Sequence, residues 1–334
     1  MSTARRCPGC KPITNGSRSA RPTGNTSPPS PWNDRAMNST TVFRDYGQEA
    51  LDAQYNNRAR VPEHQDIHAG YQARAAGVVE KFETRLDVSY GPSAEETLDV
   101  YLPENTPENA QGAPINVFLH GGYWFSRHKN DFRFLAQGLT RAGAVLVIVN
   151  YALVPSVDLD ELVRQCRAAV AWTHGNADTF GGDKERIFVS GHSAGGHLTA
   201  MMMATEWPAF AGGLPADLIK GGCAISGIYD LEPIRLIFMQ ETLGFTPEQV
   251  ARNSPIGLTP TTPAPPAPMI VAAGGDESEE FLRQSETFTA QWAKEGVPCE
   301  MMVRPGFNHF TILGEFADPE SGLTRAVRKQ MGLG

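Results

Sequence analysis

Residues 187–198 read Ile-Phe-Val-Ser-Gly-His-Ser-Ala-Gly-Gly-His-Leu, and they are the most informative part of the sequence about the fold. A β-branched and aromatic run leads into Gly-x-Ser-x-Gly, and a helix-length segment follows. A serine hydroxyl is a weak nucleophile, so it must be presented on a sharp turn where a base reaches it, and only small neighbours permit that turn. The pattern predicts a strand, a turn carrying Ser193 as nucleophile, and a helix that aims the N–H of Ala194 at a developing oxyanion.

The same alternation of short apolar runs and helix-length segments continues on both sides of this stretch. The first two runs are joined by a short Gly-Pro-Ser connection typical of a hairpin, whereas later runs are separated by the longer segments that crossover helices need. This predicts an α/β fold whose eight-stranded, mostly parallel sheet has helices on both faces. Strands are expected at 84–90, 97–102, 115–119, 145–149, 187–189, 222–226, 269–273 and 299–303, and helices at about 130–142, 158–175, 194–206, 279–295 and 319–331.

Composition excludes several classes of protein. Of the 334 residues, 41% are hydrophobic and 20% are charged, which suffices for a sizeable core and excludes a wholly disordered chain or a coiled coil. The net charge of −8 argues against nucleic-acid binding by phosphate neutralisation. No run approaches the ~18 to 20 apolar residues of a membrane span. The five cysteines are an odd number and the last three are dispersed, which indicates reduced thiols in a cytoplasmic protein.

The domain organisation is expected to be simple. Residues 1–36 are rich in Arg, Ser, Thr, Pro and Gly, with six basic residues against one acid, so we expect a disordered tail or sequence upstream of a start at Met37. Residues 37–334 are expected to form a single domain. Two segments fall outside the alternation, about 43–80 and 228–268, and both are candidate cap elements over a pocket; a long surface loop is the alternative for the second.

A second oxyanion donor is expected in the loop after the third strand, which reads Leu-His-Gly-Gly-Tyr-Trp at 119–124. Glycine lets a backbone N–H turn toward a substrate carbonyl, so Gly121 and Gly122 are the candidate donors. His120 is expected to hold this loop in place. Tyr123 and Trp124 are candidates for the pocket wall, and packing beneath the loop is an alternative that the sequence leaves open.

The remaining catalytic groups should follow later strands, in the order nucleophile, acid, base. His309 comes just after the last strand and is the candidate base, while His192, next to the nucleophile, is expected to face the pocket. The acid is less constrained. Asp276 and Glu277 both follow the strand at 269–273, and spacing does not choose between them; Asp230, after the preceding strand, is a third candidate.

Five motifs together resemble the kynurenine formamidase (arylformamidase) group of α/β hydrolases and its bacterial esterase relatives. In such enzymes the acid stands directly before Ser-x-Glu-Phe-x-Arg-Gln-Ser, which implies Glu277. Many relatives have aspartate there, and that departure keeps Asp276 open. The motifs are His-Gly-Gly-Tyr-Trp at 120–124, Gly-His-Ser-Ala-Gly-Gly-His-Leu at 191–198, Ser-Gly-Ile-Tyr-Asp-Leu at 226–231, the run 277–285 and Asn-His-Phe at 308–310.

The resemblance implies a serine hydrolase that acts through an acyl-enzyme on a small-molecule amide or ester, most simply an aryl formamide such as N-formylkynurenine. A carboxylesterase acting on short-chain or aryl esters is the alternative, and a non-catalytic binding module of the same fold is a remote one. No metal and no cofactor are expected. Neither nucleic acid nor membrane is expected as a partner, and a homodimer is left open.

Overall fold

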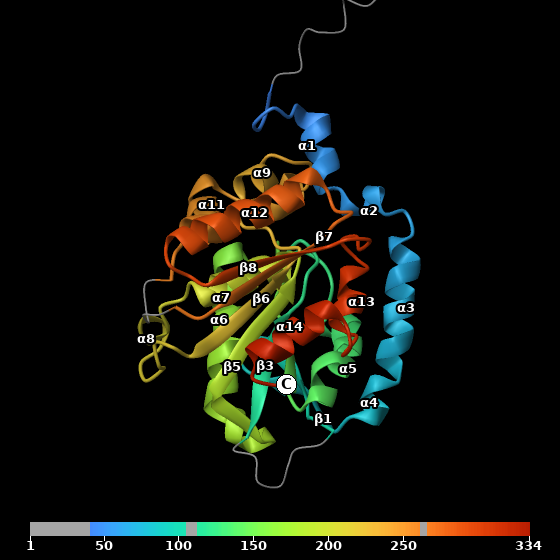
Figure 1. The fold of residues 1–334 in the computed structure, drawn as a ribbon. Coiled ribbons are helices and arrows are strands. Elements are labelled where there is room, and N and C mark those ends of the chain that lie inside the picture. Colours follow the sequence, from blue (N-terminus) through green and yellow to red (C-terminus); the bar gives the residue numbers. More distant parts are fainter. Residues whose placement is uncertain (1–40, 105–111, 261–265) are drawn as a thin grey trace, which may run out of the picture. The chain divides into compact units, whose positions relative to one another are not determined.

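The computed structural model describes residues 41–104, 112–260 and 266–334 (Figure 1). The tail predicted at residues 1–36 lies outside this part of the chain. From residue 41 onward, the described residues belong to one compact unit. None of the helices in the described part is long and apolar enough to cross a bilayer.

An eight-stranded sheet runs through the described residues in the order β1-β2-β4-β3-β5-β6-β7-β8. β2 pairs antiparallel with both β1 and β4, and all the other pairs are parallel. The predicted mostly parallel, eight-stranded sheet is therefore confirmed. The strands are β1 Thr84–Ser89, β2 Thr97–Tyr101, β3 Ala113–Leu119, β4 Val145–Val149, β5 Gly182–His192, β6 Ile219–Ile225, β7 Met269–Gly274 and β8 Cys299–Arg304.

β5 is longer than the sequence pattern predicts. Only 187–189 have the apolar, β-branched character of a strand, yet the strand continues to His192. Its last residues pair with two neighbours at once, Gly191 with Leu119 of β3 and with Ala224 of β6. This central position supplies ladder hydrogen bonds that override the low strand propensity of glycine and histidine. The strand consequently runs straight up to Ser193.

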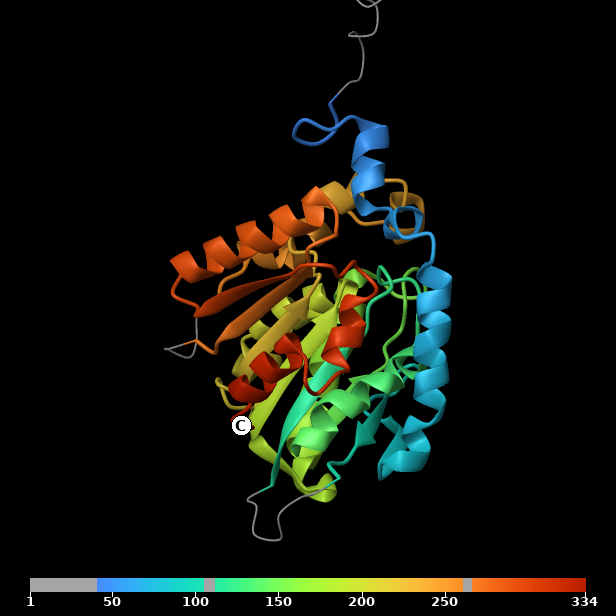
Figure 2. The same cartoon turned by 45° about the vertical axis from the view of Figure 1, so that its right-hand side comes forward.

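Helices cover both faces of the sheet, as predicted (Figures 1 and 2). Side chains of β4 alternate between two separate cores, with Leu146 and Ile148 on one face and Val145, Val147 and Val149 on the other. The first face is covered by α3 His64–Ala76, α5 Ala136–Leu139, α13 Ile312–Phe316 and α14 Gly322–Gln330, together with the 3₁₀ helix η1 Lys129–Leu135. The second is covered by α6 Leu159–Asn176, α7 Ala194–Met203 and α12 Glu279–Lys294.

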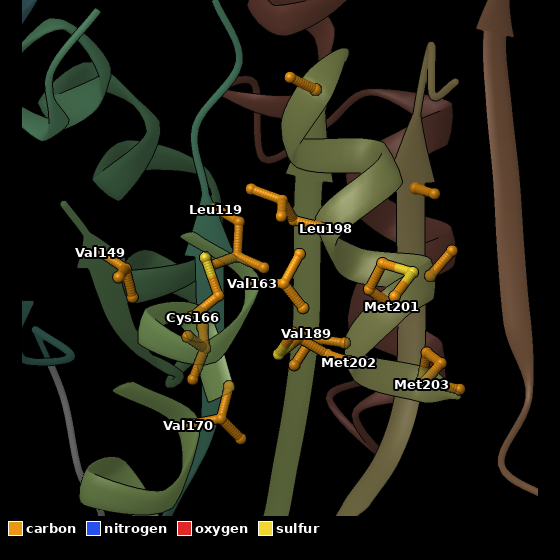
Figure 3. Close-up of a cluster of buried hydrophobic side chains, with 14 of the residues drawn as sticks. Leu119, Val149, Val163, Cys166, Val170, Val189, Leu198, Met201, Met202 and Met203 are labelled. Atoms are coloured by element: carbon orange, nitrogen blue, oxygen red, sulfur yellow. The ribbon is translucent and has the colours of Figure 1, made fainter. Parts of the chain in front are cut away.

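The core on the second face fixes the helix that follows Ser193. α7 is buried along its whole length, and Leu198 and Met202 pack with Cys166 of α6 and with Leu119 and Val189 of the sheet (Figure 3). A helix that is apolar all round has to be enclosed. The N-terminus of α7 is therefore held rigidly at the sheet edge where β5 ends.

The two segments outside the alternation contain short helices and contact each other. Gln48 Nε2 donates to the carbonyl of Leu236 at 2.8 Å, and the N–H of Phe238 donates to Asp52 Oδ1 at 2.9 Å. The second segment is therefore more than the long surface loop considered as an alternative. The first contains α1 Gln48–Tyr55, α2 Asn57–Arg60, α3 and α4 Val78–Lys81; the second contains α9 Glu232–Arg235, α10 Gln240–Leu243, α11 Pro247–Asn253 and the 3₁₀ helix η4 Pro255–Gly257.

Candidate active site

Ser193 occupies a strained turn between β5 and α7. Its φ of 57° and ψ of −119° lie in a region that residues with a Cβ rarely adopt. The turn is held by the N–H of Ser193, which donates to the carbonyl of Ile225 at 2.8 Å. The flanking glycines are required by space, because a Cβ on Gly191 would overlap the carbonyl of Gly195, and one on Gly195 would overlap the carbonyl of Leu119.

The three side chains expected to act together form a continuous chain of hydrogen bonds. His309 Nε2 lies 3.0 Å from Ser193 Oγ, and its Nδ1 lies 2.8 Å from Glu277 Oε2. With the proton of a neutral imidazole on Nδ1, the histidine donates to the carboxylate and accepts from the hydroxyl. That is the geometry in which the imidazole removes the proton of a nucleophilic serine.

Of the three candidate acids, Glu277 is the one that contacts His309. Its side chain is buried, whereas the adjacent Asp276 is exposed. Asp230 is half-buried and accepts from the N–H of Glu232 at 3.0 Å, at the start of α9. The extra methylene of glutamate thus reaches a position that neither aspartate occupies.

The second oxygen of Glu277 is also bonded. Oε1 accepts from the N–H of Gly274 at 2.6 Å and from Ser226 Oγ at 2.5 Å. Ser226 directly follows β6 and has a φ of 51°. The sequence interpretation considered the run after this serine only for Asp230 and assigned no role to Ser226. Ser226 directly follows β6, the neighbour of the strand that leads to Glu277. This position is the sequence signal that could have identified Ser226.

The loop that carries His309 is fixed from two sides. Asn308 Oδ1 accepts from the N–H groups of Phe310 at 2.9 Å and Thr311 at 3.0 Å. His192 Nε2 lies 2.7 Å from the carbonyl of His309, and burial lowers the pKa of His192 well below its usual value, so this imidazole is neutral and donates. His192 therefore both lines the pocket, as expected, and holds the backbone of His309.

Three backbone N–H groups beside Ser193 have no acceptor among the described residues. They belong to Gly121, Gly122 and Ala194. The backbone of Gly121 passes close to the nucleophile, since a Cβ placed on it would lie 3.1 Å from Ser193 Cβ and 2.6 Å from the carbonyl oxygen of His192. Buried N–H groups without an acceptor are rare in folded proteins. These three donors are available to an oxyanion that forms at Ser193.

His120 supports the glycine loop. Its ring stacks on Tyr151 with centroids 4.2 Å apart, its Nδ1 bonds the carbonyl of Gly121 at 2.9 Å, and Tyr151 donates its hydroxyl to the carbonyl of His120 at 2.5 Å. Burial lowers the pKa of His120 to about 4. Its contacts are those of a residue that holds the loop.

Trp124 is not part of the pocket wall, and this part of the sequence prediction is wrong. The indole is fully buried, and its Nε1 donates to His197 Nδ1 at 3.1 Å, while His197 Nε2 bonds the carbonyl of Asn253 at 2.7 Å. The loop turns at Gly122, Tyr123 and Trp124, which all have positive φ. This turn sends the indole down onto α7 and leaves Tyr123 in the cavity wall.

A cavity of about 130 Å³ opens in front of Ser193 and His309. Tyr123 closes one side and donates its hydroxyl to the carbonyl of Tyr55 at 2.6 Å. No group of three His, Cys, Asp or Glu side chains suited to a metal ion occurs in the described ranges. Much of the wall is apolar, formed by Phe125, Phe132, Phe238, Met239, Phe310 and Leu313.

The cavity also has polar lining residues that the sequence interpretation missed. They are Asn56, Asn57, Arg58, His68, Ser126 and Arg127. They come from α2, from the residue before it, from α3 and from the end of the glycine loop, and no fixed spacing links these segments.

A nucleophilic serine on a strand-turn-helix, hydrogen-bonded to a histidine and an acid at the edge of a mostly parallel sheet, defines a serine hydrolase of the α/β-hydrolase class. Two family models of this class match, BD-FAE over residues 98–213 and the prolyl oligopeptidase family over residues 163–322. The kynurenine formamidase of Salmo salar is 35% identical over 262 residues, which cover 78% of this chain and 85% of that enzyme. That of Danio rerio is 34% identical, covering 75% and 83%. The chain belongs to the kynurenine formamidase family.

Similar solved structures also have the α/β-hydrolase fold. A crystal structure from Silicibacter sp., provisionally described as a thioesterase, is 29% identical, covers 82% of this chain and 97% of its own, and superposes with a TM-score of 0.70. The carboxylesterase EstE1, cloned from a metagenomic library, shares the fold at a TM-score of 0.62 and 20% identity, covering 82% of this chain and 98% of its own. The chain is thus a hydrolytic enzyme with both formamidase and esterase relatives.

Proposed function

We propose that this enzyme hydrolyses aryl formamides of the N-formylkynurenine type, with Ser193, His309 and Glu277 as its catalytic triad. The observation that carries the proposal is the hydrogen-bonded chain of these three side chains, in a chain that is 35% identical to a kynurenine formamidase. Such a triad attacks an acyl carbonyl and needs no cofactor for acyl transfer. A formyl group is the smallest acyl group that it could transfer.

The reaction proceeds in two halves. Ser193 Oγ attacks the formyl carbon while His309 Nε2 takes the hydroxyl proton, and the N–H groups of Gly121, Gly122 and Ala194 bind the oxyanion. The C–N bond then breaks as the imidazolium returns its proton to the aryl amine. Water attacks the formyl ester of Ser193 with His309 as base, and formate leaves. Glu277 keeps the imidazole oriented and stabilises its cation throughout.

The cavity supports an aromatic leaving group. Its apolar wall offers rings from three segments, including Phe125, Phe310 and Phe238, and rings of this kind pack against a planar aryl group. The segments 43–80 and 228–268 both contribute wall residues: the first contributes Asn56, Asn57, Arg58 and His68, and the second contributes Phe238 and Met239. These contributions support a role for both segments as caps over the site.

A carboxylesterase acting on short-chain or aryl esters is the second candidate. The observation that favours it is the similarity to esterases such as LipC of Mycobacterium tuberculosis, which is 29% identical over 222 residues covering 61% of this chain and 54% of that enzyme. An ester has a better leaving group than an amide. Cleavage of esters alone would therefore require less transition-state stabilisation from the site.

A reducing compartment, such as the cytoplasm, is the proposed location. Cys166, Cys223 and Cys299 are free thiols in the described part of the chain. Burial raises the pKa of the Cys299 thiol to about 11 and those of the other two still further, so all three remain protonated and unreactive. Free thiols of this kind are usual where disulfides are kept reduced.

The test compares N-formylkynurenine with p-nitrophenyl acetate and butyrate, using the wild-type protein and Ser193→Ala purified in parallel. A much higher kcat/KM for the formamide, lost by a factor of about 10⁴ or more in the mutant, is the expected result. Unchanged thermal unfolding of the mutant is the control for folding. Hydrolysis of the esters alone would assign the carboxylesterase function, and near-normal turnover by Ser193→Ala would overturn the catalytic assignment.

A further inference from the structure

The cavity wall contains two arginines without an anionic partner. Arg58 and Arg127 line the cavity, and neither forms an ion pair or a side-chain hydrogen bond within the described residues. Arg58 is exposed, whereas Arg127 is partly buried and has a φ of 81°. Burial lowers the pKa of Arg127 from its ordinary value, and the charge of Arg58 lowers it further. The two guanidinium groups are thus near each other and lack a counter-charge at hydrogen-bond distance.

A residue whose buried amide has no partner among the described residues also lines this cavity. Asn57 is 4% exposed, and neither its Oδ1 nor its Nδ2 has a hydrogen-bond partner in the part of the chain that the structure describes. Leaving a buried polar group unpaired costs about 1 to 3 kcal/mol, so such a group in a cavity wall indicates a ligand that pairs with it. His68 adds a third buried atom of this kind, its Nε2.

Arg58, His68 and Arg127 extend toward the end of the cavity away from the nucleophile. Arg58, His68 and Arg127 also line an adjoining, more open cavity, which Ser193 and His309 do not reach. The two catalytic residues and the cationic group are therefore at different ends.

The acid that lines the adjoining cavity beside this cationic group has other partners. Asp131 lines the adjoining cavity, accepts from Gln72 Nε2 at 3.3 Å and from the N–H of His128 at 3.3 Å, and caps the 3₁₀ helix η1. Its charge acts on Arg127 from a distance, but no ion pair joins the two. The guanidinium therefore remains available to an external anion.

From this arrangement we infer that Arg127, Arg58 and Asn57 bind a carboxylate on the leaving-group side of the substrate. A guanidinium matches a carboxylate with two parallel hydrogen bonds, and a buried amide N–H₂ adds a third donor. The substrate class is then an acylated aryl compound that carries a carboxylate on the far side of the ring, for example in an amino-acid group. The inference rests on the proposed function and specifies which end of the substrate is recognised.

The test uses two pairs of substrates that differ only in charge. One pair is N-formylkynurenine and its carboxamide; the other is 3-(4-acetoxyphenyl)propionic acid and its carboxamide. Wild-type protein should prefer the acid of each pair by about tenfold or more in kcat/KM. Arg127→Gln should reduce this preference at least tenfold, chiefly through KM, and Arg127→Lys should restore part of it, because the charge is kept but the two-pronged geometry is lost.

Arg60→Gln is the matched control. Arg60 lies in the same helix as Arg58, is exposed and does not line the cavity, so the same loss of charge there should leave both preferences unchanged. Arg58→Gln is the second variant should Arg127→Gln fail to fold, because Arg58 is exposed, and it too should reduce the preference.

The outcomes test the carboxylate site and the formamidase function separately. Equal rates on acid and carboxamide, or equal losses on both in Arg127→Gln, would overturn the carboxylate site while leaving the formamidase function intact if N-formylkynurenine is still hydrolysed. Conversely, absence of formamide cleavage together with an Arg127-dependent preference in the ester pair would overturn the formamidase function and support the carboxylate site.

Discussion

Ser226 Oγ donates a 2.5 Å hydrogen bond to Glu277 Oε1, the carboxylate oxygen that does not contact His309. The N–H of Gly274 donates to the same oxygen, so both oxygens of the carboxylate have partners. A glutamate has one more rotatable bond than an aspartate and needs more contacts to fix its carboxylate. Ser226 and Gly274 provide them from the ends of two neighbouring strands, and the position of Glu277, the proposed triad acid, thus depends on β6 as well as on β7.

Removing the hydroxyl of Ser226 should impair catalysis without removing a catalytic group. A hydrogen bond to a charged group contributes about 1.5 to 3 kcal/mol, so Ser226→Ala should lower kcat about tenfold or somewhat more while KM changes little. Steady-state kinetics over a range of pH would measure this effect. Ser89→Ala, which removes an exposed hydroxyl on β1, should behave as wild type. An unchanged kcat in Ser226→Ala would show that Glu277 is held adequately by Gly274.

Two adjacent carboxylates allow a matched test of the triad acid. Glu277→Gln should lower kcat by about 10³ to 10⁴, because an amide does not stabilise the imidazolium of His309. Asp276→Asn removes a charge from the adjacent residue, whose side chain is exposed, and should retain nearly full activity. The kcat of both variants on the preferred substrate is the measurement, and thermal unfolding is the control for folding. The reverse ranking of the two variants would transfer the role to Asp276.

Two helical glycines should respond to alanine in opposite directions. Gly195→Ala places a Cβ against the backbone carbonyl of Leu119, which has no room to retreat, so we expect a loss of about 3 kcal/mol or more in the free energy of unfolding, together with lost activity. Gly70→Ala, in α3, meets no atom within 4 Å and should stabilise the protein by about 0.5 to 1 kcal/mol. Urea unfolding measures both, and a tolerated Gly195→Ala would mean that the loop after β3 can move.

Stability should fall between pH 7 and pH 5 because of buried histidines, among them His120 and His197. Burial lowers the pKa of His120 and of His197 to about 4. Between that value and the ordinary pKa of about 6.5, the unfolded chain binds a proton that the folded protein does not, so acidification favours unfolding. Each histidine should cost about 2 kcal/mol between these two pH values.

Urea unfolding at both pH values measures this loss. His197→Gln, although less stable at pH 7, should lose about 2 kcal/mol less than wild type on acidification. Equal stability of the wild type at the two pH values would contradict the prediction.

The three side chains that form the proposed triad could be predicted to meet because sequence order maps directly onto the sheet edge. Ser193, Glu277 and His309 follow β5, β7 and β8, and the ends of parallel strands converge. The choice of Glu277 over Asp276 came from family likeness, since both follow the same strand. Trp124 was misplaced because the side of a loop that a residue faces depends on its φ, and three consecutive positive φ values cannot be read from the residue types.

The cationic end of the cavity could not be predicted from sequence. Asn57, His68 and Arg127 come from three segments whose packing is set by tertiary contacts, and each residue alone is typical of a solvated surface. Their significance lies in what they lack, which is a hydrogen-bond or ionic partner within the described residues. A missing partner has no sequence signature.

The proposed catalytic groups and the proposed carboxylate site come from different parts of this chain. Ser193, Glu277 and His309 lie at or just after strand ends, where the sheet fixes their neighbours, whereas Asn57, Arg58 and His68 lie on α2 and α3, which form no part of the sheet. Outer segments tolerate insertion and replacement better than a packed sheet. Exchange of one N-terminal helical segment could therefore change which substrates this enzyme accepts. A chimaera that carries α1–α3 of a relative should have the substrate preference of that relative and keep the catalytic residues of this chain.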